Sequence, residues 1–125
     1  REDSWAAMLR GDNGIGPITL CDSSGLESLV AGEVSTFDPL EYIDRKDMRR
    51  MDRFTQLSLA SSIEAVEESG LDVSVAADEI GVMIGCGIGG IATLEEQFHV
   101  LFERGPSRVS PFLVPAFIPD APWPV

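Results

Sequence analysis

Residues 81–90 read GVMIGCGIGG, an apolar run that breaks into closely spaced glycines just before a helical pattern. Residues 80–84 carry only apolar or glycine side chains, which is typical of a strand buried on both faces of an α/β sheet. After the glycines, apolar residues recur at helical spacing until Gly105 and Pro106 end the pattern. The sequence therefore predicts a strand, a glycine turn and a helix in that order, and an α/β fold.

The spacing Gly85-x-Gly87-x-x-Gly90 matches the dinucleotide-binding fingerprint, in which glycines let a pyrophosphate approach a helix N-terminus. That fingerprint requires a second parallel strand after the helix. Prolines at positions 106, 111, 115 and 119 argue against one, because proline cannot donate to a central strand ladder. We therefore interpret the glycines as residues that allow tight packing of strand against helix.

Cys86 lies in the same turn, where a helix N-terminus can lower the pKa of a thiol and create a nucleophile. Its base would have to be His99, the single histidine, which lies well along the following helix. A small apolar packing residue is the preferred interpretation of Cys86, and His99 is expected at the surface. Cys21, in the turn LCDSSG, has no visible partner. These few side chains lack metal-ligand spacing, so we expect neither a metal nor a cofactor.

The clearest helix pattern covers residues 53–69, with an apolar stripe through Leu59, Ile63 and Val66 and a stop at Gly70. Its serine and alanine side chains are small, so another backbone could approach closely. This predicts a helix buried between layers. Upstream, the sequence predicts a short helix around residues 5–9, short strands and loops over residues 14–34, and a helical turn that starts at Asp38.

The charge is strongly acidic overall, with a formal net charge of -12, which argues against nonspecific nucleic-acid binding. Basic residues nevertheless gather in one run: Arg45, Lys46, Arg49, Arg50 and Arg53. Two interpretations stay open, since the interleaved carboxylates of Glu41, Asp44, Asp47 and Asp52 could neutralise the run, or the run could be a binding surface.

The hydropathy pattern gives no stretch of the roughly 18 apolar residues needed to cross a bilayer, and no targeting signal is visible. We therefore expect a soluble cytoplasmic protein that binds no membrane.

Three stretches in series resemble the β-ketoacyl-acyl carrier protein synthases, above all the type II condensing enzymes of fatty acid synthesis. They are SGLESLVAGEVSTFDPLEYIDRKDMRRMDRFTQLSLA (24–60), IGVMIGCGIGG (80–90) and LEEQFHVLFERGPSRVSPFLVPAFIP (94–119). They are similar to a D-R-K-x-x-R-R-M-D-R-F helix entry, a strand that ends in G-S-G-I-G-G, and G-P-x-x-V-S-P-F-F-x-P. The resemblance runs from about Trp5 to Pro119.

The resemblance implies a partial thiolase-like fold, the N-terminal part of an α-β-α-β-α layered condensing enzyme. Residues 1–119 would form a partial N-terminal synthase domain, and residues 120–125, DAPWPV, depart from the family pattern. We therefore expect an N-terminal fragment of a homodimeric enzyme that condenses an acyl thioester with malonyl-carrier protein. Expressed alone, it is expected to aggregate or to behave as a molten chain, because its apolar strand would lack neighbours.

The resemblance also implies roles for particular residues. The family's nucleophilic cysteine and two catalytic histidines lie beyond the matched segment, so no catalytic residue is assigned. Ile88, Leu113 and Val114 resemble residues that line or close the acyl-chain pocket. Leucine at position 113 replaces the commoner phenylalanine, which is expected to alter chain-length preference. Lys46, Arg49, Arg50 and Arg108 resemble the basic surface on which the acidic acyl carrier protein docks. Two alternatives remain, a non-catalytic module for carrier binding or dimerisation, and a fragment of a polyketide ketosynthase.

Overall fold

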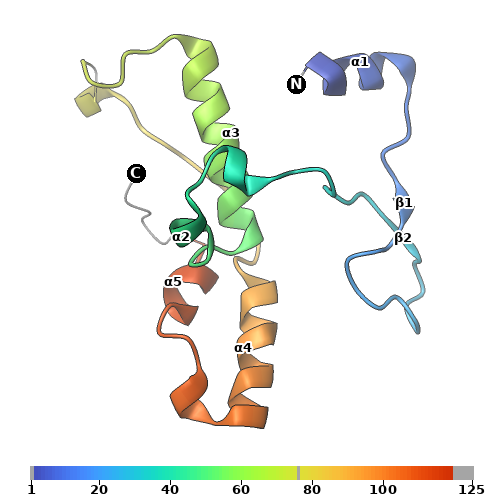
Figure 1. Cartoon of the computed structure of the whole chain (residues 1–125). Coiled ribbons are helices and arrows are strands. Elements are labelled where there is room, and N and C mark those ends of the chain that lie inside the picture. Colours follow the sequence, from blue (N-terminus) through green and yellow to red (C-terminus); the bar gives the residue numbers. More distant parts are fainter. Residues whose placement is uncertain (1, 76, 120–125) are drawn as a thin grey trace. The chain divides into compact units, whose positions relative to one another are not determined.

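The computed structural model describes residues 2–75 and 77–119 (Figure 1). The chain divides into two compact units, Arg1–Phe37 and Asp38–Val125, which are described separately below.

The first unit holds one helix and a small sheet. Helix α1 (Glu2–Arg10) starts earlier than predicted; its acidic first turn and basic last turn suit the helix dipole, and Gly11 follows it at a φ of 73°. Strands β1 (Gly16–Pro17) and β2 (Val30–Ala31) pair antiparallel, with Gly16 opposite Ala31. The prediction of short strands in this region is confirmed.

The second unit opens with a series of helical elements that end in a long helix. The 3-10 turn η1 (Pro39–Glu41) begins where the Asp38 carboxylate accepts from the Leu40 amide at 2.9 Å, as the Asp-Pro pair predicts. Helices α2 (Arg45–Met48) and α3 (Arg53–Ser69) follow. Helix α3 has the predicted bounds, because Asp52 caps its start and Gly70, at a φ of 65°, ends it.

The rest of the second unit packs a helical hairpin. The turn η2 (Ala77–Glu79) precedes α4 (Ile91–Arg104), η3 (Pro106–Arg108) and α5 (Leu113–Phe117). Helix α4 contacts both η3 and α5, and Figure 1 shows the chain turning back along it. The helix predicted after the glycines, with its stop at Gly105, is confirmed.

Two predictions for the centre of the chain are wrong. Residues 80–84 form no strand, and Val82 and Met83 are 77% and 98% exposed. A strand needs a neighbour to take its backbone hydrogen bonds, and the only pairing in the described part of the chain is β1 with β2. Nor is α3 buried between layers, since Ala60 is its one buried residue. The described chain is thus helix-rich with a small sheet, a partial α/β arrangement.

The core of the second unit is correspondingly small. Its buried apolar side chains are Ile43, Met51, Ala60 and Ala116. None of the helices in residues 2–75 and 77–119 has the length and apolarity that a membrane span requires.

Candidate functional site

One buried carboxylate joins the N-termini of α3 and α4. Asp52, only 8% exposed, accepts from the Phe54 amide at 3.4 Å through Oδ1. Its Oδ2 accepts from the Thr93 amide at 2.9 Å and from the Thr93 hydroxyl at 2.6 Å. The residue that caps α4 in the chain is Gly90, which has no side chain, so Asp52 supplies that cap from far upstream. This arrangement fixes the basic segment 45–53 beside the glycine turn.

The last two glycines of the turn pack against α5. The Gly90 amide donates to the Phe117 carbonyl at 2.9 Å. A Cβ atom on Gly89, at a φ of 86°, would lie 2.2 Å from the same carbonyl oxygen, and one on Gly90 would lie 2.5 Å from the Ala116 oxygen. By contrast, a Cβ on Gly85 or Gly87 would meet nothing within 4 Å. Tight packing is thus the role of the second glycine pair, although the partner is a helix and not the predicted strand.

Cys86 has a different role from the predicted one. Its Sγ accepts a hydrogen bond from the Gly89 amide at 3.1 Å, so the half-buried thiol closes the glycine turn and is not simply an apolar filler. His99 and Cys21 are exposed, as predicted for His99. Within the residues that the structure describes, no three His, Cys, Asp or Glu side chains gather as metal ligands would.

The residues implied for an acyl pocket lie on two segments that touch. Ile88 is in the glycine turn and is 65% exposed; Leu113 and Val114 open α5, the first half-buried and the second 62% exposed. The bond between the Gly90 amide and the Phe117 carbonyl connects the turn to α5. The structure therefore brings the two segments together, whereas none of the three side chains lines the groove described next.

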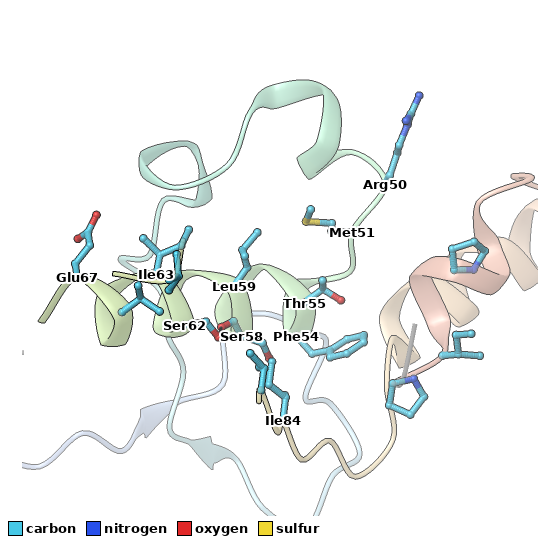
Figure 2. Close-up of a pocket in the computed structure, with 16 residues that line it drawn as sticks. Arg50, Met51, Phe54, Thr55, Ser58, Leu59, Ser62, Ile63, Glu67 and Ile84 are labelled. Carbon is cyan, nitrogen blue, oxygen red and sulfur yellow. Dashed lines mark hydrogen bonds between the residues drawn. The ribbon is translucent and has the colours of Figure 1, made fainter. Parts of the chain in front are cut away.

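An apolar groove of about 730 Å³ runs along α3 and was not predicted. It is lined mainly by α3, and the residues outside that helix are Arg50, Met51, Val73, Val82, Ile84, Pro115, Ile118 and Pro119. Figure 2 shows Ile84 alongside α3 near Ser58, with Arg50 and Glu67 toward opposite ends. The signal was present in the apolar stripe of α3 and in the apolar run 80–84, which here form the two sides of an open groove.

Three of the four implied docking residues are exposed cations. Lys46 lies in α2, Arg49 directly follows it and Arg108 lies in η3. Over residues 2–75 and 77–119, none of the three makes an ion pair. The interpretation that interleaved carboxylates neutralise the run is therefore wrong for Lys46 and Arg49, and their charges face solvent.

Arg50 differs from the other three. It is half-buried, and its guanidinium carbon lies 4.6 Å from the centre of the Phe112 ring. This is a cation–π contact, and it connects the basic segment to the residue directly before Leu113.

A tyrosine anchors the turn η1 to α3. The Tyr42 hydroxyl donates to the Glu64 carboxylate at 2.5 Å. This hydrogen bond raises the pKa of Tyr42 above its usual value, because losing the proton would break the bond and place two negative charges together. The contact helps to hold the segment that leads into α2.

Comparisons with known proteins identify the family of this chain. The family model for the β-ketoacyl synthase N-terminal domain matches residues 1–121. The chain itself is 45% identical to 3-oxoacyl-[acyl-carrier-protein] synthase 2 of Synechocystis sp. over 118 residues, which are 94% of its length. It is 47% identical, over the same share, to the protein of that name from Staphylococcus aureus. The chain spans 28% and 29% of the length of these two relatives. Because the family model covers nearly every residue, this chain belongs to the β-ketoacyl synthase family, and its match is to the N-terminal domain of that family.

Proposed function

We propose that the chain is the N-terminal part of a cytoplasmic 3-oxoacyl-[acyl-carrier-protein] synthase that elongates fatty acids. The observation that carries the proposal is the 45–47% identity over 118 residues to relatives of that name. In such a reaction, an acyl group passes from a carrier thioester to an enzyme cysteine. The malonyl group of a second carrier then loses carbon dioxide, and the resulting carbanion attacks the acyl carbonyl. The cysteine thiolate leaves, and a 3-oxoacyl carrier thioester is formed.

This chain contributes no catalytic group of its own to that reaction. The family chemistry uses one cysteine and two histidines, and the 125 residues contain a single histidine. Cys86 is engaged with the backbone of its own turn, and Cys21 lies exposed on the other unit. We therefore assign the chain two accessory roles, docking of the carrier protein and shaping of the acyl pocket.

Carrier docking is proposed for the exposed Lys46, Arg49 and Arg108, and for the half-buried Arg50. Support comes from their exposure and from the lack of ion pairs to the first three within the described residues. An unneutralised basic surface on a protein of net charge -12 would orient an acidic partner toward this one place.

Charge reversal tests this docking role. Arg49→Glu and Arg108→Glu are each expected to weaken binding of acyl carrier protein by about tenfold, because a like charge replaces an attractive one. Arg10→Glu is the matched control, since it makes the same charge change in the first unit. Calorimetric titrations at two salt concentrations would measure the effect. Equal weakening by all three substitutions would show that only net charge matters and would reject the docking surface.

Acyl-pocket shaping is proposed for Ile88, Leu113 and Val114. The contact between the glycine turn and α5 supports it, because a shift in either segment would move the other. A larger side chain at position 88 is expected to favour shorter acyl groups in a condensing enzyme that contains this chain.

We also propose the layered thiolase-like α-β-α-β-α arrangement and a homodimer for the whole enzyme. The apolar residues 80–84 would become a sheet strand once neighbouring strands are present, and the groove along α3 would then be filled by protein. Residues 1–119 are the proposed domain. The predicted departure from the family pattern at residues 120–125 lies outside the described residues.

A chimera tests the proposed enzyme directly. This chain would replace the matching 118 residues of the Synechocystis relative. The chimera is expected to form 3-oxoacyl product from acyl- and malonyl-carrier protein, whereas the 125-residue chain alone is expected to form none. A folded chimera without activity would contradict the proposal, as would activity of the chain alone.

A second candidate is a non-catalytic module that binds carrier protein. The exposed cations at positions 46, 49 and 108, which pair with no carboxylate among the described residues, favour it. It predicts that the chain alone binds carrier, with the charge-reversal pattern given above, while the chimera fails to condense.

A further inference from the structure

Arg50 stands apart from the cations beside it in the sequence. Arg49 is exposed, but Arg50 is half-buried with its guanidinium over the Phe112 ring. Arg50 also lines the apolar groove together with Pro115, which lies in α5. The contact with the ring restricts where this guanidinium can lie, whereas no such contact is seen for the side chain of Arg49 in the described part of the chain.

The residue that Arg50 contacts controls the start of α5. Phe112 is the N-cap residue of α5, and its carbonyl accepts from the Ala116 amide at 3.0 Å. Its own amide donates to the Ser110 hydroxyl at 3.1 Å, and the Ser110 amide donates to the Gln97 side chain at 2.7 Å. The segment is therefore attached to α4 through Gln97 and to the basic segment through Arg50.

We propose that Arg50 is a positioning residue, because its contact with Phe112 sets the start of α5 and with it the acyl-selecting side chains of Leu113 and Val114. The inference rests on the proposed function for the acyl selection, whereas the positioning itself concerns only this chain. The contact between Arg50 and Phe112 connects the proposed docking surface for the carrier to the segment that is proposed to select the acyl group.

The expected size of the effect follows from the contact. A cation–π contact at a partly exposed site raises the ratio of the paired to the unpaired conformation by about two- to fivefold. Removing either side chain is expected to raise the open fraction of the first turn of α5 by the same factor. Loss of both is expected to loosen it by no more than loss of one, because the two side chains act as a pair.

The experiment uses the 125-residue chain with Arg50→Gln, Phe112→Leu and the double substitution. Arg49→Gln is the matched control, since it removes the same charge one residue away. Hydrogen exchange at the Leu113 and Ala116 amides, which donate to the Ser110 and Phe112 carbonyls, reports the start of α5. We expect about two- to fivefold faster exchange in both single variants and in the double variant, and no change with Arg49→Gln. Exchange at the wild-type rate with Arg50→Gln would overturn the inference, and so would additive effects or unprotected amides in the wild type.

A second readout separates positioning from docking. Titrations with carrier protein that bears a short or a long acyl chain give a ratio of two affinities. Arg49→Gln is expected to weaken both and to leave the ratio unchanged, whereas Arg50→Gln and Phe112→Leu are expected to change the ratio. An unchanged ratio in the last two variants would overturn the acyl-selecting part. If the wild-type chain binds no carrier at all, the proposed docking fails, and hydrogen exchange still decides whether Arg50 positions α5.

Discussion

The Asp52 carboxylate caps two helices of the second unit. A helix begins with backbone N–H groups that have no partner inside the helix, and Asp52 accepts from such groups of both α3 and α4. Each of its oxygens serves a different helix. A shorter or apolar side chain would leave both helix starts unsatisfied in a partly buried place.

Asp52→Ala is expected to destabilise the second unit by about 2 kcal/mol, roughly the sum of two lost caps. Asp44→Ala is the control, since Asp44 precedes α2 but makes no capping hydrogen bond, and it should cost less than about 0.5 kcal/mol. Urea unfolding followed by circular dichroism measures the free energy of unfolding of both variants. Hydrogen exchange at the Phe54 and Thr93 amides shows whether the two helix starts are the places that lose protection. Equal costs for the two variants would contradict the double cap.

Gly90→Ala separates the packing role of the glycine turn from a nucleotide role. The new methyl group would lie 2.5 Å from the Ala116 oxygen and 3.0 Å from the Asp52 side chain, so we expect a loss of about 2 kcal/mol or more. Gly87→Ala meets open space and should change stability by less than about 0.5 kcal/mol. The same urea titrations measure the difference. A Gly87→Ala variant as unstable as Gly90→Ala would show that the turn packs in another way.

Among the elements, the two-stranded sheet relies on a side chain beyond its strands. Glu33, just past β2, accepts from the Thr19 hydroxyl at 2.6 Å and from the Thr19 and Leu20 amides at 2.9 Å and 3.0 Å. These bonds, the hydroxyl first, lower the pKa of Glu33 below its ordinary value of 4.5. The carboxylate thus extends the contact between two strands that are very short by themselves.

The sheet should loosen in acid for this reason. A carboxyl whose pKa is lowered by folding stabilises the folded form above its unfolded pKa, and the stabilisation is lost as the pH falls through the folded value. We therefore expect the protection of the Thr19 and Leu20 amides, relative to their intrinsic exchange rates, to fall as the pH drops below about 4.5. Glu33→Gln should show low protection at every pH, while Glu27→Gln should behave like the wild type. Protection that does not change with pH in the wild type would contradict this role.

At the scale of the whole molecule, the described chain exposes an apolar run at residues 82–84. Val82, Met83 and Ile84 are all exposed, and their backbone takes part in no strand. An extended apolar segment with unpaired backbone groups is a template for association with another chain. The small core of the second unit adds little to oppose such association.

The 125-residue chain is therefore expected to associate with itself as its concentration rises. Met83→Glu should reduce association, because it puts a charge in the middle of the apolar run. Met8→Glu, which makes the same change on exposed α1, should have little effect. Sedimentation velocity over a range of concentrations measures this. A wild-type chain that stays monomeric and unfolds in one sharp urea transition would contradict the prediction.

The sequence by itself determined the two long helices, α3 and α4, and the family. The bounds of α3 follow from Asp52 and Gly70, and the start of η1 follows from Asp38 and Pro39. Helical hydrogen bonds close within four residues, so capping and stop residues act locally and can be read along the chain. The three motif stretches indicated the β-ketoacyl synthases, and the family comparison confirmed it. The roles of the predicted pocket and docking residues stay predictions.

Only the tertiary structure decided which distant residues meet. The bond from Asp52 to Thr93, the stack of Arg50 on Phe112 and the packing of Gly90 on α5 each join segments with no shared local pattern. The same reason explains the error at residues 80–84, whose apolar pattern is that of a strand. A strand forms only when another segment supplies its hydrogen bonds, and in the described part of this chain no strand pairs with it.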